Sequence, residues 1–197
     1  MIINNYEKLS TLLDFPSEDI FYHLQILQRK KDHPELLKDT HVIKVYYIKS
    51  LNDLSDHWDE IKNLCRMFRA RAMLNINARS FRKCTLESLK ILADYISNVD
   101  FKKSARVFDH ACGVTTAGLD HRWVIDIDYP LIRPVVDIKD FIYKCRPEGD
   151  KIITEIPTAI GMHLITRPFD RKQFGDEFKN LYNIHTNNPT LLYFERD

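Results

Sequence analysis

The stretch WVIDID at Trp123–Asp128 places two carboxylates, Asp126 and Asp128, two positions apart at the end of an apolar run. The run predicts a β-strand, and because successive side chains of a strand point to opposite faces, both carboxylates share one face. Two carboxylates on one face repel each other and require a compensating cation, commonly a divalent metal held by oxygen ligands. The stretch therefore indicates a metal site, and the plainer alternative is a solvated turn at a strand end.

The segments that follow predict a β-α-β-β-α-β order. A helix with a buried stripe comes first, then a hairpin of two short strands, then a second helix and a last strand. The segments are 137–145 for the first helix, 151–156 and 162–166 for the hairpin strands, 170–178 for the second helix and 191–194 for the last strand. This order is the split βαβ arrangement of ferredoxin-like and RRM-like folds, a four-stranded antiparallel sheet with helices on one face and the other face open for ligands.

A lone histidine, His163, falls in the second hairpin strand. The first and third strands of such a unit are the adjacent central pair, so the topology predicts that His163 lies beside Asp126 and Asp128. This combination suits a nucleoside triphosphate, because Mg²⁺ or Mn²⁺ held by the aspartates can bridge phosphate oxygens. Arg167, just after the histidine strand, is the expected supporting phosphate contact. The alternative for His163 is a hydrogen-bonded structural residue.

The N-terminal part predicts one helix followed by a β-α-β-α unit. The helix covers 17–31 with Ser17 as its N-cap, and the unit covers 41–99. Its last helix is expected to bury a stripe of Leu86, Leu89, Leu92 and Ile96. We therefore expect an α+β chain in which an N-terminal helical segment and a β-α-β-α unit (1–120) precede the RRM-like unit (121–197), both within one compact structural domain.

The composition is that of an ordered globular protein, with 197 residues, 44% hydrophobic and 29% charged residues, and a net charge of +1. This balance neither supports nor excludes nucleic acid as a partner, because a local basic patch can bind it. Four cysteines without CxxC spacing argue against a disulfide framework, and no common zinc spacing is present. With no signal peptide and no apolar stretch of membrane-spanning length, we expect a cytoplasmic protein without a membrane partner.

Two segments carry a resemblance to a known family. Ile125–Asp128 resembles a hydrophobic-Asp-hydrophobic-Asp strand, and Thr158–Leu164 resembles a glycine-containing hairpin that ends in a histidine. These are similar to the first two catalytic motifs of the archaeo-eukaryotic primase superfamily, which includes primases and primase-polymerases. The fold of that family, an αβ unit preceding an RRM-like unit, is also similar to the order predicted over residues 41–195.

The resemblance implies a metal-dependent nucleotidyltransferase similar to a minimal primase-polymerase core. Its substrates would be nucleoside triphosphates and a single-stranded nucleic-acid template, and a helicase or other replication protein would be a partner. Asp126 and Asp128 would be the catalytic ligands of Mg²⁺ or Mn²⁺, and His163 the catalytic contact to the nucleotide phosphates.

The sequence departs from the family pattern in two places. The family has a third acidic residue near the start of its last strand, where Asn183 stands here. A neutral amide oxygen offsets less metal charge than a carboxylate does. Three acids elsewhere are candidates for the missing ligand: Asp170, Asp176 and Glu195. A serine commonly precedes the family histidine by two residues, and Gly161 occupies that position.

A basic cluster surrounds the second strand of the first half and includes Arg66 and Lys83. Four of its arginines are predicted to bind nucleic acid, because guanidinium groups match phosphate geometry. They are Arg69, Arg71, Arg79 and Arg82. The alternative is a solvated, charged helix end.

Other functions fit the sequence less well. A two-histidine phosphoesterase needs His-x-Thr motifs, and the segment from His163 to Thr166 is one residue too long. A metal-dependent nuclease using Glu155 lacks the usual lysine two positions later, where Pro157 stands. The stronger alternative is a catalytically inactive RRM-like module of a replication system that binds nucleic acid or a protein. An RNA-binding sheet normally presents stacking aromatic rings, whereas the predicted central strands carry acids and a histidine.

Overall fold

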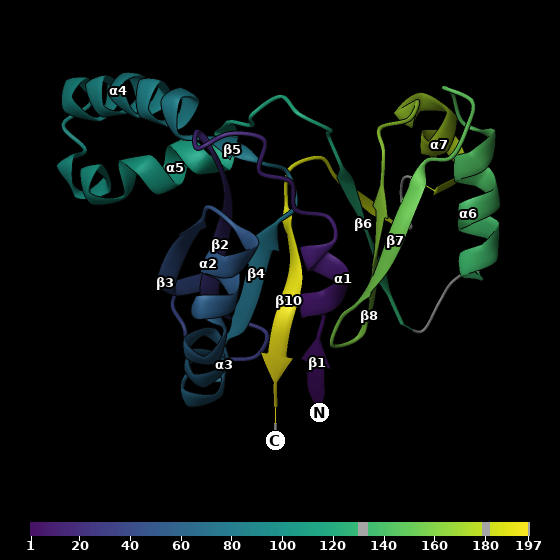
Figure 1. The fold of residues 1–197 in the computed structure, drawn as a ribbon, viewed down its shortest axis with the longest axis horizontal. Coiled ribbons are helices and arrows are strands. Elements are labelled where there is room, and N and C mark those ends of the chain that lie inside the picture. The colour runs from purple at the N-terminus through teal and green to yellow at the C-terminus, as the bar shows by residue number, and fades with distance from the viewer. Residues whose placement is uncertain (130–133, 179–181, 197) are drawn as a thin grey trace.

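A computed structural model describes residues 1–129, 134–178 and 182–196 (Figure 1). Two antiparallel sheets form its framework, and seven α-helices accompany them among the described residues. The first sheet lies at the centre of Figure 1 and the second to its right, so the chain forms two units side by side. The predicted α+β class is confirmed.

The first sheet has the strand order β1-β10-β4-β2-β3, with β5 paired to β2. Its strands are β1 (Ile2–Asn4), β2 (Ile20–Arg29), β3 (Thr40–Ile48), β4 (Arg71–Asn75), β5 (Arg79–Ser80) and β10 (Pro189–Glu195), and its helices are α1 (Tyr6–Ser10), α2 (Leu51–Asp56) and α3 (Trp58–Met67). Leu9, Leu54 and Ile61 are fully buried in the core that these helices share with the sheet. β2 lies between β3 and β4, so an antiparallel strand separates the two strands of the predicted β-α-β-α unit.

The helix predicted over residues 17–31 was wrong, because most of that segment is β2. Every side chain from Ile20 to Leu24 is buried. Tyr22 and Leu24 join the main core, whereas Phe21 packs on the opposite face against the ring of Phe81 at a centroid distance of 4.2 Å. A strand covered on both faces is apolar throughout, so helical spacing also occurs within it by chance.

A helical arm, formed by α4 (Phe81–Ser97), a 3₁₀ helix at Phe101–Arg106 and α5 (Val107–Val114), projects from the first sheet at the upper left of Figure 1. The stripe predicted to be buried on α4 was wrong: Leu86, Leu89 and Ile96 are 53%, 61% and 56% exposed. The buried residues of α4 are Cys84 and Ile91, which pack toward α5. Periodicity identifies an apolar stripe, but the position of the neighbouring helix decides which face is covered.

The second sheet has the strand order β7-β8-β6-β9 and is antiparallel throughout. Its elements are β6 (Trp123–Asp128), α6 (Val135–Lys144), β7 (Ile152–Pro157), β8 (Gly161–Thr166), α7 (Arg171–Phe178) and β9 (Asn183–His185). The first five elements of the predicted order are present, and the sixth element of this sheet unit is β9 rather than the predicted strand at 191–194. Ile125 from the sheet, Ile138 and Ile142 from α6, and Phe174 from α7 share one apolar cluster, so both helices cover the same face.

The last predicted strand was assigned to the wrong sheet. Residues 191–194 belong to β10, which pairs with β1 and β4 of the first sheet, and β9 takes the edge position beside β6. The side chains of Thr190–Phe194 are all buried, which requires a central position in a sheet. The end of the predicted 121–197 unit therefore returns to the first sheet.

The prediction that one face of the second sheet is open was also wrong for much of that face. Val124, Ile156 and Ile165 on this face are buried within the main core of the first unit. The first sheet and its helices cover them because these apolar side chains gain more from burial than from exposure to water. The remaining part of the face borders a groove between the two units.

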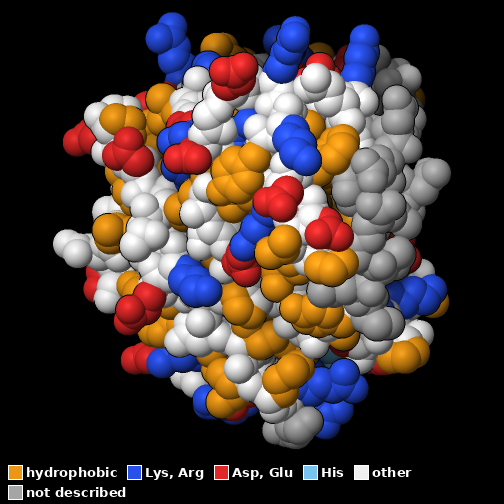
Figure 2. Space-filling view, turned by 90° about the vertical axis from the view of Figure 1, so that its right-hand side faces the viewer, with side chains coloured by type: hydrophobic (Ala, Val, Ile, Leu, Met, Phe, Trp, Pro, Cys, Tyr) orange, Lys and Arg blue, Asp and Glu red, His pale blue; other side chains and the backbone are white. Residues whose placement is uncertain are grey.

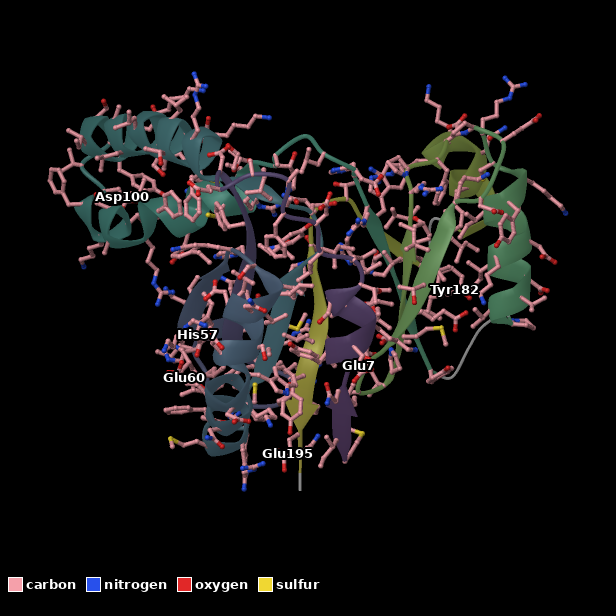
Figure 3. The ribbon with its side chains drawn as sticks, in the orientation of Figure 1. Glu7, His57, Glu60, Asp100, Tyr182 and Glu195 are labelled. Atoms are coloured by element: carbon pink, nitrogen blue, oxygen red, sulfur yellow. The ribbon has the colours of Figure 1, made fainter. Side chains whose placement is uncertain are left out.

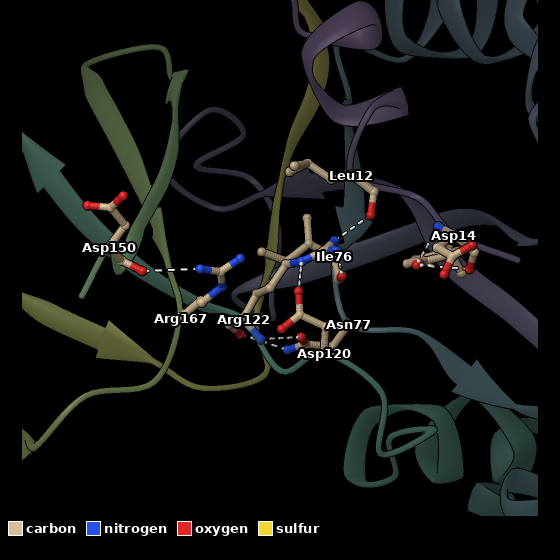
Figure 4. A network of polar contacts seen from close by, with 9 residues as sticks. Leu12, Asp14, Ile76, Asn77, Asp120, Arg122, Asp150 and Arg167 are labelled. Carbon is tan, nitrogen blue, oxygen red and sulfur yellow. Dashed lines mark hydrogen bonds and ion pairs between the residues drawn. The ribbon is translucent and has the colours of Figure 1, made fainter. Parts of the chain in front are cut away.

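Hydrogen bonds around Arg122 join the two units just before β6 (Figure 4). The Arg122 backbone N–H donates to Asn77 Oδ1 at 2.7 Å, and Asn77 Nδ2 donates to the carbonyl oxygens of Arg122 at 2.9 Å and Thr186 at 3.2 Å. The Arg122 guanidinium also donates to the carbonyl oxygen of Leu12. Asn77 is 3% exposed, so a buried amide just after β4 ties the first unit to both ends of the second unit.

The outer face of the second unit mixes side chains of all kinds (Figure 2). Lys and Arg side chains project along its upper edge, and basic, acidic and apolar side chains are interspersed below. Over the described residues, no helix combines the length and apolarity needed to cross a membrane.

Candidate active site

Asp126 and His163 face each other across the central strand pair of the second sheet. The β6–β8 register pairs these residues directly, which confirms the predicted adjacency of their strands. Asp126 Oδ1 lies 3.4 Å from His163 Nε2, and His163 Nδ1 lies 2.7 Å from the hydroxyl oxygen of Thr190 on β10. The histidine is therefore held from both sides, by the second sheet and by the first.

Asp128 lies on the same face as Asp126, one step further along β6, and both carboxylates line one groove. Its register partner on β8 is Gly161. A Cβ atom on Gly161 would collide with the Ile127 carbonyl oxygen and would lie 2.9 Å from Asp128 Cα. Glycine at this position therefore allows the backbone of β8 to approach the acidic end of β6.

Electrostatics keep the Asp126 carboxyl ionised. Its contact with His163 is the largest cause that lowers the pKa of Asp126, and burial opposes this effect. Positive charge on His185 and on Lys31 lowers the pKa of Asp126 further. The pKa of His185 itself is lowered by burial. The Asp126 side chain is 37% exposed and that of His163 is 13% exposed, so the carboxylate can reach a ligand.

A cationic wall faces the carboxylates across the groove. We use this name for Arg29 and Lys31, at and just after the end of β2, and Arg71 on β4. Arg71 forms a two-pronged ion pair with Asp32 at 2.7 and 2.9 Å. Burial, and then repulsion from Arg29 and Arg71, lowers the pKa of Lys31. Within the described part of the chain, Arg29 and Lys31 have no carboxylate within ion-pair distance, so their charge is directed at the groove.

The groove is narrow between Asp128 and the cationic wall, with a volume of about 20 Å³, and it widens away from Asp128 into a hollow of about 290 Å³, close to the lower limit of about 300 Å³ for small-molecule sites. Asp126, His163 and Arg29 border both parts. Met73 also borders both parts, and the wider part is additionally lined by Leu27, Thr40, Val124, His185, Asn188 and Pro189. It therefore offers apolar contact area next to a charged end.

The oxygen ligands that this groove offers a divalent cation are the carboxylates of Asp126 and Asp128. The described residues contain no group of three His, Cys, Asp or Glu side chains arranged to hold a metal. Asn183 on β9 pairs with Asp126, so the two side chains share a face, and Asn183 is exposed. Mg²⁺ commonly binds one or two carboxylates and completes its shell with water and phosphate oxygens, which is what two acids and an amide permit.

The predicted substitutes for a third acid lie elsewhere. Glu195 forms an ion pair with Arg66 at 3.2 Å at the end of β10. Asp170 Oδ1 accepts a hydrogen bond from the Lys172 backbone at the start of α7. The Asp176 side chain lies outside the described residues.

Arg167 is not brought to the groove. It is exposed beyond the far end of β8, and its guanidinium donates to the carbonyl oxygen of Asp150 at 3.2 Å (Figure 4). Since β8 runs from Gly161 near the acidic pair to Thr166 at the other end, Arg167 lies a strand length away from Asp128.

The four arginines predicted to bind nucleic acid do not form one surface. Arg79 is fully buried and donates to Cys112 O at 2.6 Å, Asn77 O at 2.7 Å and Asn187 Oδ1 at 2.9 Å, so this prediction was wrong. A buried guanidinium with such partners is structural. The other three are dispersed: Arg71 in the cationic wall, Arg69 in a separate hollow with Arg66, and Arg82 exposed at the start of α4.

Sequence reasoning missed Arg29, Lys31 and Thr190. The basic run at residues 29–31 was a usable signal, but the helix predicted over that segment concealed that it ends a central strand. No local signal connects Thr190 to His163, because the contact depends on β10 joining the first sheet.

No protein-family model matches the chain, and neither a curated protein nor a solved structure matches it. Function is therefore inferred from the chemistry of the site.

Proposed function

We propose that the protein is a metal-dependent nucleotidyltransferase with a core like that of a minimal primase-polymerase. One observation carries the proposal: across a single groove, Asp126 and Asp128 face Arg29 and Lys31, two cations that have no ion-pair partner among the described residues. A metal-bound triphosphate has this charge pattern, because its metal seeks carboxylates while its phosphates seek Arg and Lys. His163 lines the same groove as the two carboxylates and the two cations.

The second unit is assigned to the RRM-like class within this proposal. Strand order β7-β8-β6-β9 with both helices on one face supports the assignment. The carboxylates then stand on the central strand, on the face away from the helices.

Each residue has a role in the proposed site. Asp126 and Asp128 would hold Mg²⁺ or Mn²⁺, and the ion would supply Lewis-acid stabilisation of phosphate oxygens. Arg29 and Lys31 bind the phosphates in place of the predicted Arg167. With the Thr190 hydroxyl donating to Nδ1 of His163, the Nε2 proton points toward Asp126 and can instead be donated to a phosphate oxygen.

A second candidate is an inactive nucleic-acid-binding or protein-binding module of a replication system. Asn183, beside Asp126 on the edge strand, favours it, because an amide cannot offset a second metal charge as a carboxylate does.

Thermal denaturation with Mn²⁺ and a nucleoside triphosphate tests the nucleotide site. A ligand at 100 times its Kd stabilises the folded state by about 2.7 kcal/mol, so the wild type is expected to melt at a higher temperature. Asp126→Asn/Asp128→Asn should abolish this rise, whereas Asp137→Asn/Asp140→Asn, which changes two exposed acids of α6, should retain it. Equal rises in all three proteins, or none in any, contradict the proposed site.

Primer synthesis on single-stranded DNA then separates the two candidates. The enzyme extends or starts a strand in the presence of Mn²⁺ and loses this activity in Asp126→Asn/Asp128→Asn. Nucleotide binding without any synthesis favours the inactive module.

A further inference from the structure

A second basic hollow lies against the helical arm and shares no lining residue with the candidate active site. Its volume is about 380 Å³. Four cationic side chains and two rings line it: Lys38, Lys102, Lys103, Arg106, Tyr95 and His110. These residues are far apart in the sequence, because Lys38 precedes β3 while the others follow from α4 onward.

Most of this positive charge is uncompensated. Lys103 pairs with Asp100 at 2.6 Å at the outer end of the arm, where Figure 3 labels Asp100. Within the described ranges, Lys38, Lys102 and Arg106 have no carboxylate at ion-pair distance. All three are exposed. Like charges gathered without partners are unfavourable unless they meet an anion.

The one acid of the hollow, Asp109, is turned to internal partners. Its Oδ1 accepts a hydrogen bond from the Tyr47 hydroxyl at 2.7 Å and lies 3.7 Å from His23 Nε2. Its charge is thereby directed toward β2 and β3, and the cations dominate the mouth of the hollow.

An aromatic pair adds a flat surface beside the cations. The rings of Tyr95 and His110 are 6.1 Å apart with an interplanar angle of 21°, and the Tyr95 hydroxyl lies 2.6 Å from His110 Nδ1. When the tyrosine donates this hydrogen bond, His110 carries its remaining proton on Nε2 as a further donor. Lys103 Nζ lies 5.8 Å from the Tyr95 ring. Basic side chains combined with aromatic rings are the means by which single-stranded nucleic acid is bound without sequence preference.

The hollow and the active-site groove come near each other at the start of β3. Lys38 lines the hollow and Thr40 lines the groove, and two residues of chain span at most about 7 Å between Cα atoms. A flexible, repeating polyanion can therefore contact both, whereas a small anion can occupy only one.

We propose that the hollow on the helical arm binds the phosphates and a base of single-stranded nucleic acid and leads the strand toward the groove. Its role as a template path rests on the proposed function, but the binding itself does not.

Fluorescence anisotropy with a labelled single-stranded oligonucleotide tests the proposal. Lys102→Glu/Arg106→Glu is expected to weaken binding at least tenfold. The logarithm of the binding constant falls linearly with the logarithm of the salt concentration, and losing two phosphate contacts should make this slope less steep by about 1.4. Lys144→Glu/Lys172→Glu makes the same change of charge on the second unit and should bind nearly as the wild type does. Lys102→Gln/Arg106→Gln, a milder change, should lie between them.

Several outcomes overturn the proposal. One is that the arm and control variants bind the oligonucleotide with equal affinity and equal salt dependence. Another is that the wild type does not bind it measurably. A third is that polyglutamate displaces the oligonucleotide as readily as unlabelled DNA does. Thermal shifts with Mn²⁺ and nucleotide, measured on the same variants, keep the two proposals apart. The arm variant should retain the shift, and Asp126→Asn/Asp128→Asn should lose the shift while still binding the oligonucleotide.

Discussion

His163 on β8 stands between two partners from different sheets, with Asp126 Oδ1 3.4 Å from its Nε2 and the Thr190 hydroxyl 2.7 Å from its Nδ1. The β6–β8 register alone would bring the acid and the histidine together. The contact to Thr190 requires the chain to return to the first sheet, so the position of the imidazole reports how the two units are packed.

Thr190→Val should remove the hydroxyl from His163 while keeping the side-chain shape. We expect a loss of about 1 kcal/mol in unfolding free energy, the usual net value of one hydrogen bond, and weaker nucleotide binding. Nitrogen chemical shifts of His163 should show a changed tautomer population. Thr166→Val is the matched control, because the Thr166 hydroxyl is buried and has no hydrogen-bond partner among the described residues. Its stability should be unchanged or increased, and an equal loss in both variants would contradict the assigned role of Thr190.

Replacement of His163 by Asn should change how stability depends on pH. The pKa of Asp126 is lowered in the folded state, chiefly by His163, so this contact stabilises the protein above the ordinary Asp pKa of 3.8. That stability is lost as the pH falls through the folded-state pKa. The variant should be less stable than the wild type by up to roughly 1 kcal/mol at pH 6, because a partly exposed pair is screened. Urea denaturation should show that the difference in unfolding free energy between wild type and variant shrinks below pH 4. The same difference at pH 6 and below pH 4 would argue against the Asp126–His163 pair.

Gly161→Ala should be destabilising, because its Cβ would meet the Ile127 carbonyl oxygen and the Asp128 backbone. Overpacking against backbone atoms typically costs about 1–3 kcal/mol. Gly113→Ala is the control: no atom lies within 4 Å of a Cβ there, and the residue is helical. Chemical denaturation should show stability equal to or above that of the wild type for Gly113→Ala. Equal stability of the two variants would mean that β8 does not approach β6 so closely.

Arg79→Met should reduce stability rather than nucleic-acid affinity. Its guanidinium is fully buried and makes three hydrogen bonds, and leaving such partners unsatisfied costs about 3 kcal/mol or more. Arg82→Gln, at an exposed position three residues away, should stay within about 0.5 kcal/mol of the wild type. A stable Arg79→Met protein with impaired DNA binding would restore the original prediction for this residue.

Prediction from sequence succeeded where the signal was local. Strand β6, the α6 stripe of Ile138 and Ile142, and the hairpin of β7 and β8 follow from alternation, helical spacing and turn residues over short windows. Prediction failed for β2, which is covered on both faces, and for the side of α4 that is buried. In both cases the neighbouring elements decide which side chains are covered.

The residues of the candidate site also differ in whether a local sequence pattern predicts their positions. The sequence by itself determined that Asp126 and Asp128 share a face, because strand alternation is a property of adjacent residues. It also predicted the adjacency of His163 through the order of elements. Only the tertiary structure decided that Arg29 and Lys31 oppose the acids and that Thr190 orients the histidine. Arg29 and Thr190 lie on strands of the first sheet and Lys31 comes just after one, and which strands meet depends on burial of the whole core rather than on any local pattern.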